Sequence, residues 1–123
     1  MKIGVFSKKV GLNIDTIRYY EKIGLIKPTI VNSHRQYSNE DVDDINTIIK
    51  LKRNGFTLLE IKAMFDLSNE VDNGSNDVNN LFQLKEMFTE KYHDMVQREK
   101  QILEIKQVLK RAIGKLDSVL DGN

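Results

Sequence analysis

Arginine, tyrosine and lysine side chains gather in one short segment near the N-terminus. Residues 13–26 read NIDTIRYYEKIGLI. Arginine can pair with guanine or grip a phosphate, tyrosine hydroxyls can donate to phosphate oxygens, and lysine adds positive charge. Four residues of the segment fall on one face of a helix, at i, i+3, i+4 and i+7: Asp15, Arg18, Tyr19 and Lys22. These residue types at this spacing predict a surface that binds nucleic acid.

The start of the chain is predicted to form a helix that precedes this surface. Ile3, Phe6 and Val10 recur at i, i+3 and i+7, and Gly11 follows where helices commonly end. Asn13 can then cap a second helix with its side-chain oxygen. Two short helices joined by a tight turn form a helix-turn-helix, whose second helix can enter the major groove of DNA.

The second helix is expected to have an inward and an outward side. Ile14, Ile17 and Tyr20 share the inward side, and for Tyr20 a core role and a DNA role are equally expected. Asp15 and Thr16 lie near the helix N-terminus, where base edges are usually reached. The predicted DNA-binding residues of this helix are therefore Asp15, Thr16, Arg18, Tyr19, Tyr20 and Lys22.

A short two-stranded ribbon is predicted within residues 25–37. β-Branched residues are followed there by Asn32 and Ser33, a pair typical of turns. Such a ribbon can serve as a wing beside the helix-turn-helix. Arg35 and Tyr37 are then placed to reach the flanking DNA backbone or the minor groove.

Two capping boxes predict where the next two helices begin. SNED at residues 38–41 and TLLE at residues 57–60 each place a hydroxyl group three positions before a carboxylate. Gly55 is expected to end the first of these helices. The apolar residues predicted to face inward from the two helices are Val42, Ile45, Ile48, Ile49, Leu58, Ile61 and Phe65.

The C-terminal part is predicted to be one helix from about residue 78 to residue 119. Its apolar residues recur every seven positions: Leu81, Phe88, Met95, Ile102, Leu109 and Leu116. A stripe this narrow needs a partner helix, most simply that of a second copy, so a homodimer through a coiled coil is expected. The fold class is therefore mainly α, with a winged helix-turn-helix head, a small two-stranded wing and a long C-terminal coiled-coil helix.

The polar segment SNEVDNGSNDVNN separates the head from this helix. Its composition is typical of a loop or a helix entry. The predicted domains are residues 1–67 for DNA binding, 68–80 for the hinge and helix entry, and 81–123 for dimerisation.

Charge is distributed unevenly along the chain. Residues 1–37 hold seven basic and two acidic residues, a net charge of +5. Residues 38–75 carry a net charge of −4 and residues 76–123 a net charge of zero. The basic N-terminal third suits a polyanionic partner.

The chain contains no cysteine and two histidines, His34 and His93. Disulfides, thiolate metal ligands and thiol redox sensing are thereby excluded, and neither a metal site nor a cofactor is expected. No nucleophile and base are arranged for catalysis, so an enzyme is not expected. No apolar run approaches the length of a membrane span, and the N-terminus lacks the apolar core of a signal peptide, which predicts a cytoplasmic protein.

The chain resembles the MerR-type transcription regulators. The resemblance rests on IGVFSKKVGLNIDTIRYYEKIGLI, on the following HRQYS, and on LKRNGFTLLEIK before a long helix. It implies a winged helix-turn-helix head and a homodimer through an antiparallel coiled coil. It also implies binding to a pseudo-palindromic site in a promoter spacer, which these regulators bend and untwist so that RNA polymerase can use the promoter.

The resemblance also implies roles for single residues. Arg18 matches the family's recognition-helix arginine, and Tyr19 and Tyr20 match its backbone-contacting aromatic pair. Arg35 and Tyr37 match its wing residues. Metal-sensing members carry cysteines that this chain lacks, so the signal is left open, including whether a small-molecule effector exists.

Two other functions are consistent with the same sequence. An architectural, excisionase-like protein could bend DNA with this head without acting on transcription. A coiled-coil interaction protein could instead use the basic head to bind another protein. The second of these predicts a dimer with no DNA affinity above the nonspecific level.

Overall fold

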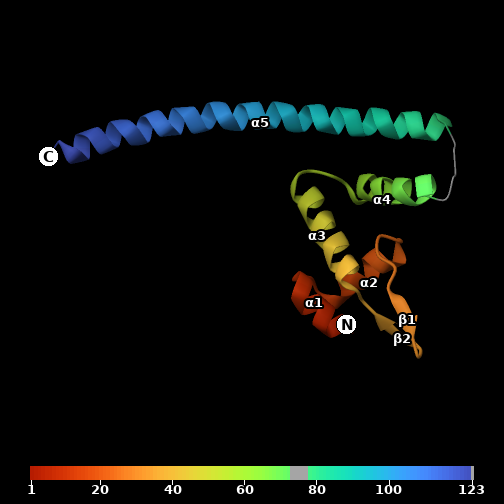
Figure 1. The fold of residues 1–123 in the computed structure, drawn as a ribbon. Helices are drawn as coiled ribbons and strands as arrows, with labels where there is room; N and C mark the ends of the chain where they lie inside the picture. The colour runs from red at the N-terminus through yellow and green to blue at the C-terminus, as the bar shows by residue number, and fades with distance from the viewer. Residues whose placement is uncertain (73–77, 123) are drawn as a thin grey trace. The chain divides into compact units, whose positions relative to one another are not determined.

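The structure, a computed structural model, describes residues 1–72 and 78–122. The chain divides into two units, Met1–Ser75 and Asn76–Asn123. Within its described residues, the second unit contains one helix, α5 (Val78–Asp121). The elements of the first unit are α1 (Ile3–Val10), α2 (Ile14–Lys22), β1 (Thr29–Val31), β2 (His34–Gln36), α3 (Asn39–Arg53) and α4 (Leu58–Asp72) (Figure 1).

A tight turn joins α1 to α2. Gly11 adopts φ +74°, a left-handed conformation that costs glycine little, and its N–H donates to the Ser7 carbonyl at 2.9 Å. Asn13 caps α2, because its side-chain oxygen accepts the Thr16 N–H at 2.8 Å. Both predicted helices and the predicted cap are confirmed.

The predicted ribbon is also confirmed. β1 and β2 pair antiparallel, with Ile30 opposite Arg35. Asn32 and Ser33 both have positive φ, at 51° and 66°, as the tightest hairpin turns require. Tyr37 follows β2 and makes two backbone bonds with Met1, each 2.7 Å long. These bonds tie the base of the wing to the start of the chain.

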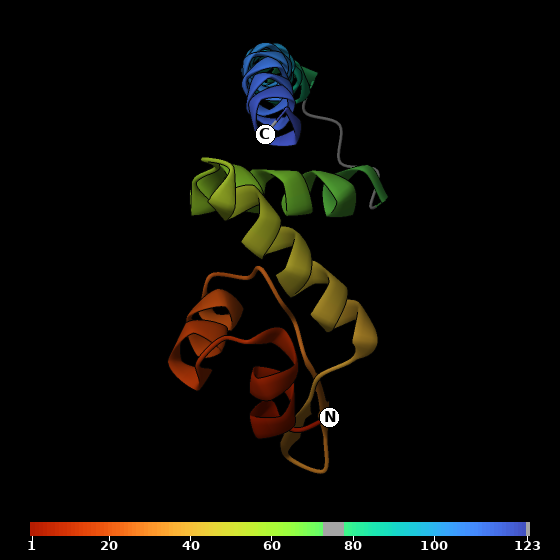
Figure 2. The ribbon, with the colours of Figure 1, turned by 90° about the vertical axis from the view of Figure 1, so that its left-hand side faces the viewer.

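Capping boxes begin the next two helices, as predicted. At α3 the Ser38 N–H donates to the Asp41 carboxylate and the Asp41 N–H to the Ser38 hydroxyl. Thr57 and Glu60 exchange the equivalent bonds, at 2.9 and 3.1 Å, at the start of α4. Figure 2 shows α3 running between the helix-turn-helix and α4 within this unit.

The core of the first unit lies between α1, α2, α3 and α4. The aromatic rings of Phe6 and Tyr37, both part of this core, stack with centroids 4.5 Å apart. Ile14, expected to face inward, is 36% exposed because it is the first residue of α2, at the edge of the core. The fully buried side chains include Phe6, Ile17, Ile26, Tyr37, Ile45, Ile48 and Ile61.

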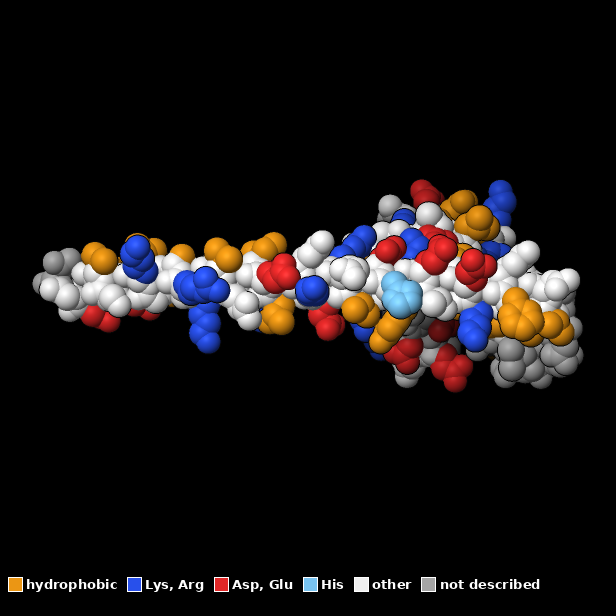
Figure 3. Space-filling model, turned by 90° about the horizontal axis from the view of Figure 1, so that it is seen from above, with side chains coloured by type: hydrophobic (Ala, Val, Ile, Leu, Met, Phe, Trp, Pro, Cys, Tyr) orange, Lys and Arg blue, Asp and Glu red, His pale blue; other side chains and the backbone are white. Residues whose placement is uncertain are grey.

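The described part of the second unit is dominated by one uninterrupted helix, as predicted. α5 has 44 residues, which at about 1.5 Å per residue gives a length of roughly 66 Å. None of its described side chains is buried. Figure 3 shows hydrophobic side chains in a row along one edge of its C-terminal part. The exposed apolar residues of that part are Ile102, Leu103, Ile105, Val108, Leu109, Ile113, Leu116, Val119 and Leu120.

Helix extends into both ends of the segment whose composition indicated a loop or a helix entry, and α5 begins at residue 78 as predicted. α4 continues to Asp72 and α5 begins at Val78, so helix covers 68–72 and 78–80 of the segment predicted to be a loop or a helix entry. The remaining part, residues 73–77, lies outside the described residues. The proposed domain limits at 67 and 81 stay predictions.

Candidate nucleic-acid interface

The outward side of α2 carries exposed polar and basic groups. Arg18, Lys22 and Asp15 are exposed, and Tyr19 exposes 51% of its surface. Thr16 is half-buried, and its N–H is already used by the cap. The opposite side of the helix buries Ile17 and Tyr20. Most of the predicted DNA-binding face of α2 is therefore exposed and accessible to a ligand.

The wing and α2 enclose two adjoining hollows. One, of about 420 Å³, is lined by Arg18, Glu21, Lys22 and Arg35. The other, of about 250 Å³, is lined by Lys2, Ile3, Arg18, Ser33, His34 and Arg35. Arg18 and Arg35 line both, so the hollows form one continuous basic surface. Closely spaced guanidinium and ammonium groups of this kind bind phosphate oxygens.

One carboxylate lies within this basic surface. Glu21 Oε1 accepts the Arg35 Nε–H at 2.5 Å, which joins α2 to β2. The other oxygen, Oε2, accepts the Tyr37 hydroxyl at 3.2 Å. The bond and the charge of Glu21 raise the pKa of Arg35, so the guanidinium stays charged. Burial, together with the charge and bond of Glu21, raises the pKa of Tyr37 to about 12.

Tyr37 is buried at the base of the wing. Only 1% of its surface is exposed, because its ring stacks on Phe6 and its hydroxyl binds Glu21. This burial disfavours the expected wing contact of Tyr37 with DNA, which stays a prediction, and the same contacts fix Tyr37 at the base of the wing. Tyr20 is 4% exposed, which favours its core role over direct contact with DNA.

Sequence reasoning did not predict a role in binding for two residues of this surface, Glu21 and Lys2. Glu21 stands in the Arg-Tyr-Tyr-Glu motif but was given no role, since its partners come from the wing. Lys2 and His34 line the second hollow because the Met1 to Tyr37 pairing brings the N-terminus beside β2. Sequence spacing gives no signal for that pairing.

The buried phenol of Tyr37 predicts a pH dependence of stability. Its pKa rises from an ordinary 10.0 to about 12 in the folded protein, so its contribution is full below pH 10 and is lost as the pH rises toward 12. Urea unfolding from neutral pH to above pH 10 is expected to show a falling free energy of unfolding. Tyr37→Phe keeps the ring stack, and a fall of the same steepness in this variant would contradict the assignment.

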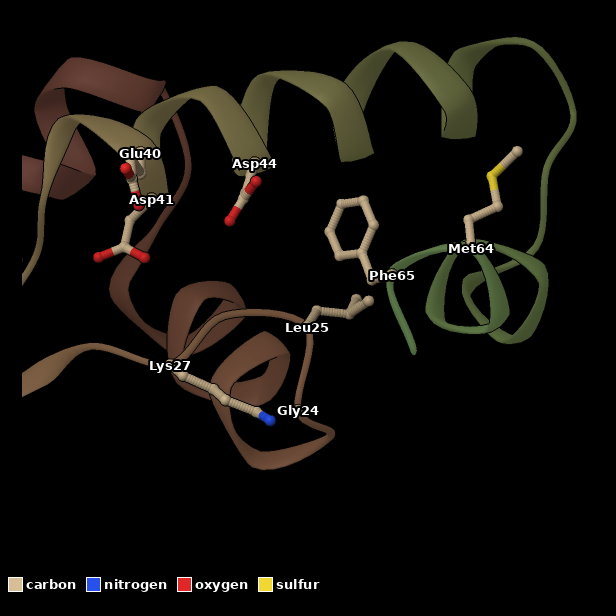
Figure 4. A pocket seen from close by; sticks show the side chains of 8 residues that line it. All are labelled: Gly24, Leu25, Lys27, Glu40, Asp41, Asp44, Met64 and Phe65. Carbon is tan, nitrogen blue, oxygen red and sulfur yellow. The ribbon is translucent and has the colours of Figure 1, made fainter. Parts of the chain in front are cut away.

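A further hollow, of about 480 Å³, lies among α3, α4 and the segment after α2 (Figure 4). Its wall on α3 carries carboxylates, and Phe65 and Leu25 approach each other at its apolar end. Burial and three neighbouring carboxylates raise the pKa of Asp44. This negative wall repels phosphate, so DNA is not expected to bind here. The lining residues are Gly24, Leu25, Lys27, Glu40, Asp41, Asp44, Met64 and Phe65.

The expected dimerisation residues all lie on α5. Ile102, Leu109 and Leu116 are exposed, whereas Leu81, Phe88 and Met95 are half-buried. Within residues 1–72 and 78–122, no three His, Asp or Glu side chains are grouped closely enough to hold a metal ion. No helix in the described part of the chain is long and apolar enough to cross a membrane.

Comparison with known proteins identifies the family to which this fold belongs. Residues 1–68 match the family described as MerR HTH family regulatory protein. A crystal structure of a MerR family transcriptional regulator from Listeria monocytogenes superposes with a TM-score of 0.66, at 26% identity, over 95% of this chain and 86% of that one. A lead(II)-bound transcription regulator of Ralstonia metallidurans, 21% identical over 90% of this chain and 86% of that one, has the same fold, with a TM-score of 0.55.

Two relatives extend the match along the sequence. A ZntR-type transcriptional regulator homologue of Haemophilus influenzae is 31% identical over 87% of this chain and 82% of its own length. The mercuric resistance operon regulatory protein of Bacillus cereus is 31% identical over 86% of this chain and 83% of its own length. These relatives are regulators and not enzymes. The chain therefore belongs to the MerR family of DNA-binding helix-turn-helix transcription regulators.

Proposed function

We propose that this regulator acts as a homodimer on a pseudo-palindromic promoter site and alters the shape of the DNA between its two heads. Each head anchors to phosphates, each α2 reads bases in the major groove, and the intervening spacer is bent and untwisted. The observation that supports this most directly is the uncovered basic surface that joins α2 to the wing. Its shared arginines are Arg18 and Arg35.

The apolar stripe of α5 supports an antiparallel dimer with a definite register. Ile102, Leu109 and Leu116 occupy position a of the heptads, and Ile105, Ala112 and Val119 occupy position d. Reversing one helix about a point between residues 110 and 111 places each a residue opposite a d residue. In this register Ile102 of one copy meets Val119 of the other, and Leu109 meets Ala112.

In the same register, two charged residues that interrupt the heptad pattern lie outside the contact between the two helices. Lys91 and Arg98 stand at d positions in the first half of α5 and would otherwise face apolar side chains. Registers centred nearer to residue 100 would place both charged side chains in the contact between the two helices. The C-terminal half of α5 is therefore the proposed dimerisation surface.

The spacing of the two heads sets the form of the binding site. Two heads held apart by a coiled coil are expected to reach half-sites about two helical turns apart. RNA polymerase at the same promoter is the proposed protein partner, and a small-molecule effector remains a proposal without an assigned site. A thiolate-bound metal is not that effector, because the chain has no cysteine. A role on promoter DNA also supports a cytoplasmic location.

Selection of bound sequences from random duplexes tests this function. The expected product is one two-fold symmetric site with two half-sites. With roughly six or more phosphate contacts per dimer, log K should fall against log salt with a slope of about −5 or steeper. A dimer without any preferred sequence at physiological salt would instead support the protein-interaction module.

A second measurement separates a regulator from an architectural protein. Transcription in vitro from a promoter that carries the selected site is expected to change when the protein is added. Bending of the DNA without any change in the amount of transcript would favour an architectural, excisionase-like protein.

A further inference from the structure

We propose that Glu21 is a positioning residue that fixes Arg35 of the wing relative to α2. By doing so, it raises the specificity of the protein for its operator, the DNA site that it recognises. The proposal rests on the proposed function, because it concerns how the same basic surface meets DNA. It assigns no contact with DNA to Glu21 itself.

Glu21 joins three parts of the head. It belongs to α2, and its two carboxylate oxygens are bound by Arg35 of β2 and by the hydroxyl of Tyr37. Tyr37 is itself fixed, through its ring on Phe6 and through both backbone bonds to Met1. Glu21 therefore holds the mobile side chain of Arg35 from a rigid base.

The environments of the two charged groups differ. The side chain of Glu21 is 19% exposed, whereas that of Arg35 is 59% exposed. Arg35 also lines both basic hollows, so its exposed part faces the space that a phosphate would enter. A long arginine side chain loses rotamer freedom when it binds a phosphate. Restraint by Glu21 before binding lowers that entropic cost and sets the angle of the wing.

A carboxylate at this place has a cost as well. Its negative charge lies in the surface that approaches the DNA phosphates and weakens their attraction to Arg18, Arg35 and Lys22. This cost applies to every DNA sequence, whereas the gain from a fixed wing applies only where phosphates lie in the matching geometry. Glu21 is thus expected to lower nonspecific affinity and to raise operator affinity.

The proposal is tested by whether the affinities for operator DNA and for nonspecific DNA change in opposite directions. In Glu21→Ala, binding to the selected operator is expected to weaken by about tenfold, and binding to a scrambled duplex to strengthen by roughly twofold to threefold. Competition titrations at two salt concentrations measure both. Glu104→Gln removes one negative charge from an exposed position of α5 and is expected to leave the ratio of the two affinities unchanged. Glu21→Gln keeps the side-chain volume and serves if the alanine variant folds poorly.

A double-mutant cycle tests whether Glu21 acts through Arg35. In an Arg35→Ala background, Glu21→Ala is expected to lose no operator affinity, because the group it positions is absent, and to keep only the roughly twofold to threefold gain from removing its charge. A full tenfold loss in that background would overturn the proposal. Equal losses on operator and scrambled DNA would also overturn it, since they indicate damage to the fold. If the wild-type protein itself shows no preferred sequence, the proposed function fails instead.

Discussion

Leu109→Asp is expected to convert the protein to a monomer and to weaken operator binding by at least about a hundredfold, because linked binding of two heads typically adds a factor of 10² or more. Leu109 exposes 56% of its surface in the single chain and lies next to the centre of the proposed coiled coil. Each dimer would bury two carboxylates among apolar side chains, at a high desolvation cost. Sedimentation at micromolar concentration and operator titration measure the two effects.

A matched variant separates dimerisation from charge. Gln107→Asp places the same charge two residues away, at heptad position f, on the outer side of the proposed coiled coil. It is expected to remain dimeric and to bind the operator within about twofold of the wild type. A Leu109→Asp protein that stays dimeric would remove the C-terminal half of α5 from the interface.

The direction of the two helices can be tested in the same cysteine-free chain. Ile102→Cys and Val119→Cys proteins, mixed and oxidised, are expected to form the mixed disulfide in an antiparallel dimer. In that arrangement two copies of residue 102 lie roughly 25 Å apart, at about 1.5 Å per residue, too far to be bridged. A parallel dimer would give the two homogeneous disulfides instead.

The elements of the head could be predicted because their signals are local. A cap or a turn depends on residues within four positions of each other, as in the Ser38 to Asp41 box and the Asn32 to Ser33 turn. The heptad spacing likewise predicted α5 without any knowledge of its surroundings. The extension of α4 to Asp72 was missed because its polar residues favour loops by composition, and composition is a weak predictor against an established helix.

Contacts between distant elements could not be read from the sequence in the same way. Tyr37 follows Arg35 closely in a strand-like segment, so both were expected to share the wing surface. Residues two apart in one strand point to the same face, but β2 ends at Gln36, and Tyr37 just beyond the strand is buried in the core. Glu21 of α2 bridges these two separated side chains, because one of its carboxylate oxygens binds Arg35 and the other binds Tyr37.

The remaining large effect concerns base reading by α2. Arg18 is exposed and lines both basic hollows, whereas the ion pair of Glu21 goes to Arg35. A guanidinium can donate two parallel bonds to the major-groove edge of guanine, and no phosphate contact gives comparable discrimination between bases. Arg18 is therefore the proposed reader of one base in each half-site, and Arg35 an anchor to the backbone.

Arg18→Ala is expected to cost about 1 to 3 kcal/mol in operator binding and to relax the preference for one base pair per half-site. Arg18→Lys separates base reading from charge, because lysine keeps the charge but not the paired donors. A base-reading role predicts a loss in Arg18→Lys close to that of the alanine variant, and a phosphate role predicts near wild-type binding. Lys27→Ala, at the acidic hollow, removes an equal charge from the head and is expected to change affinity little. Operator affinity that survives Arg18→Ala unchanged would exclude Arg18 from the interface.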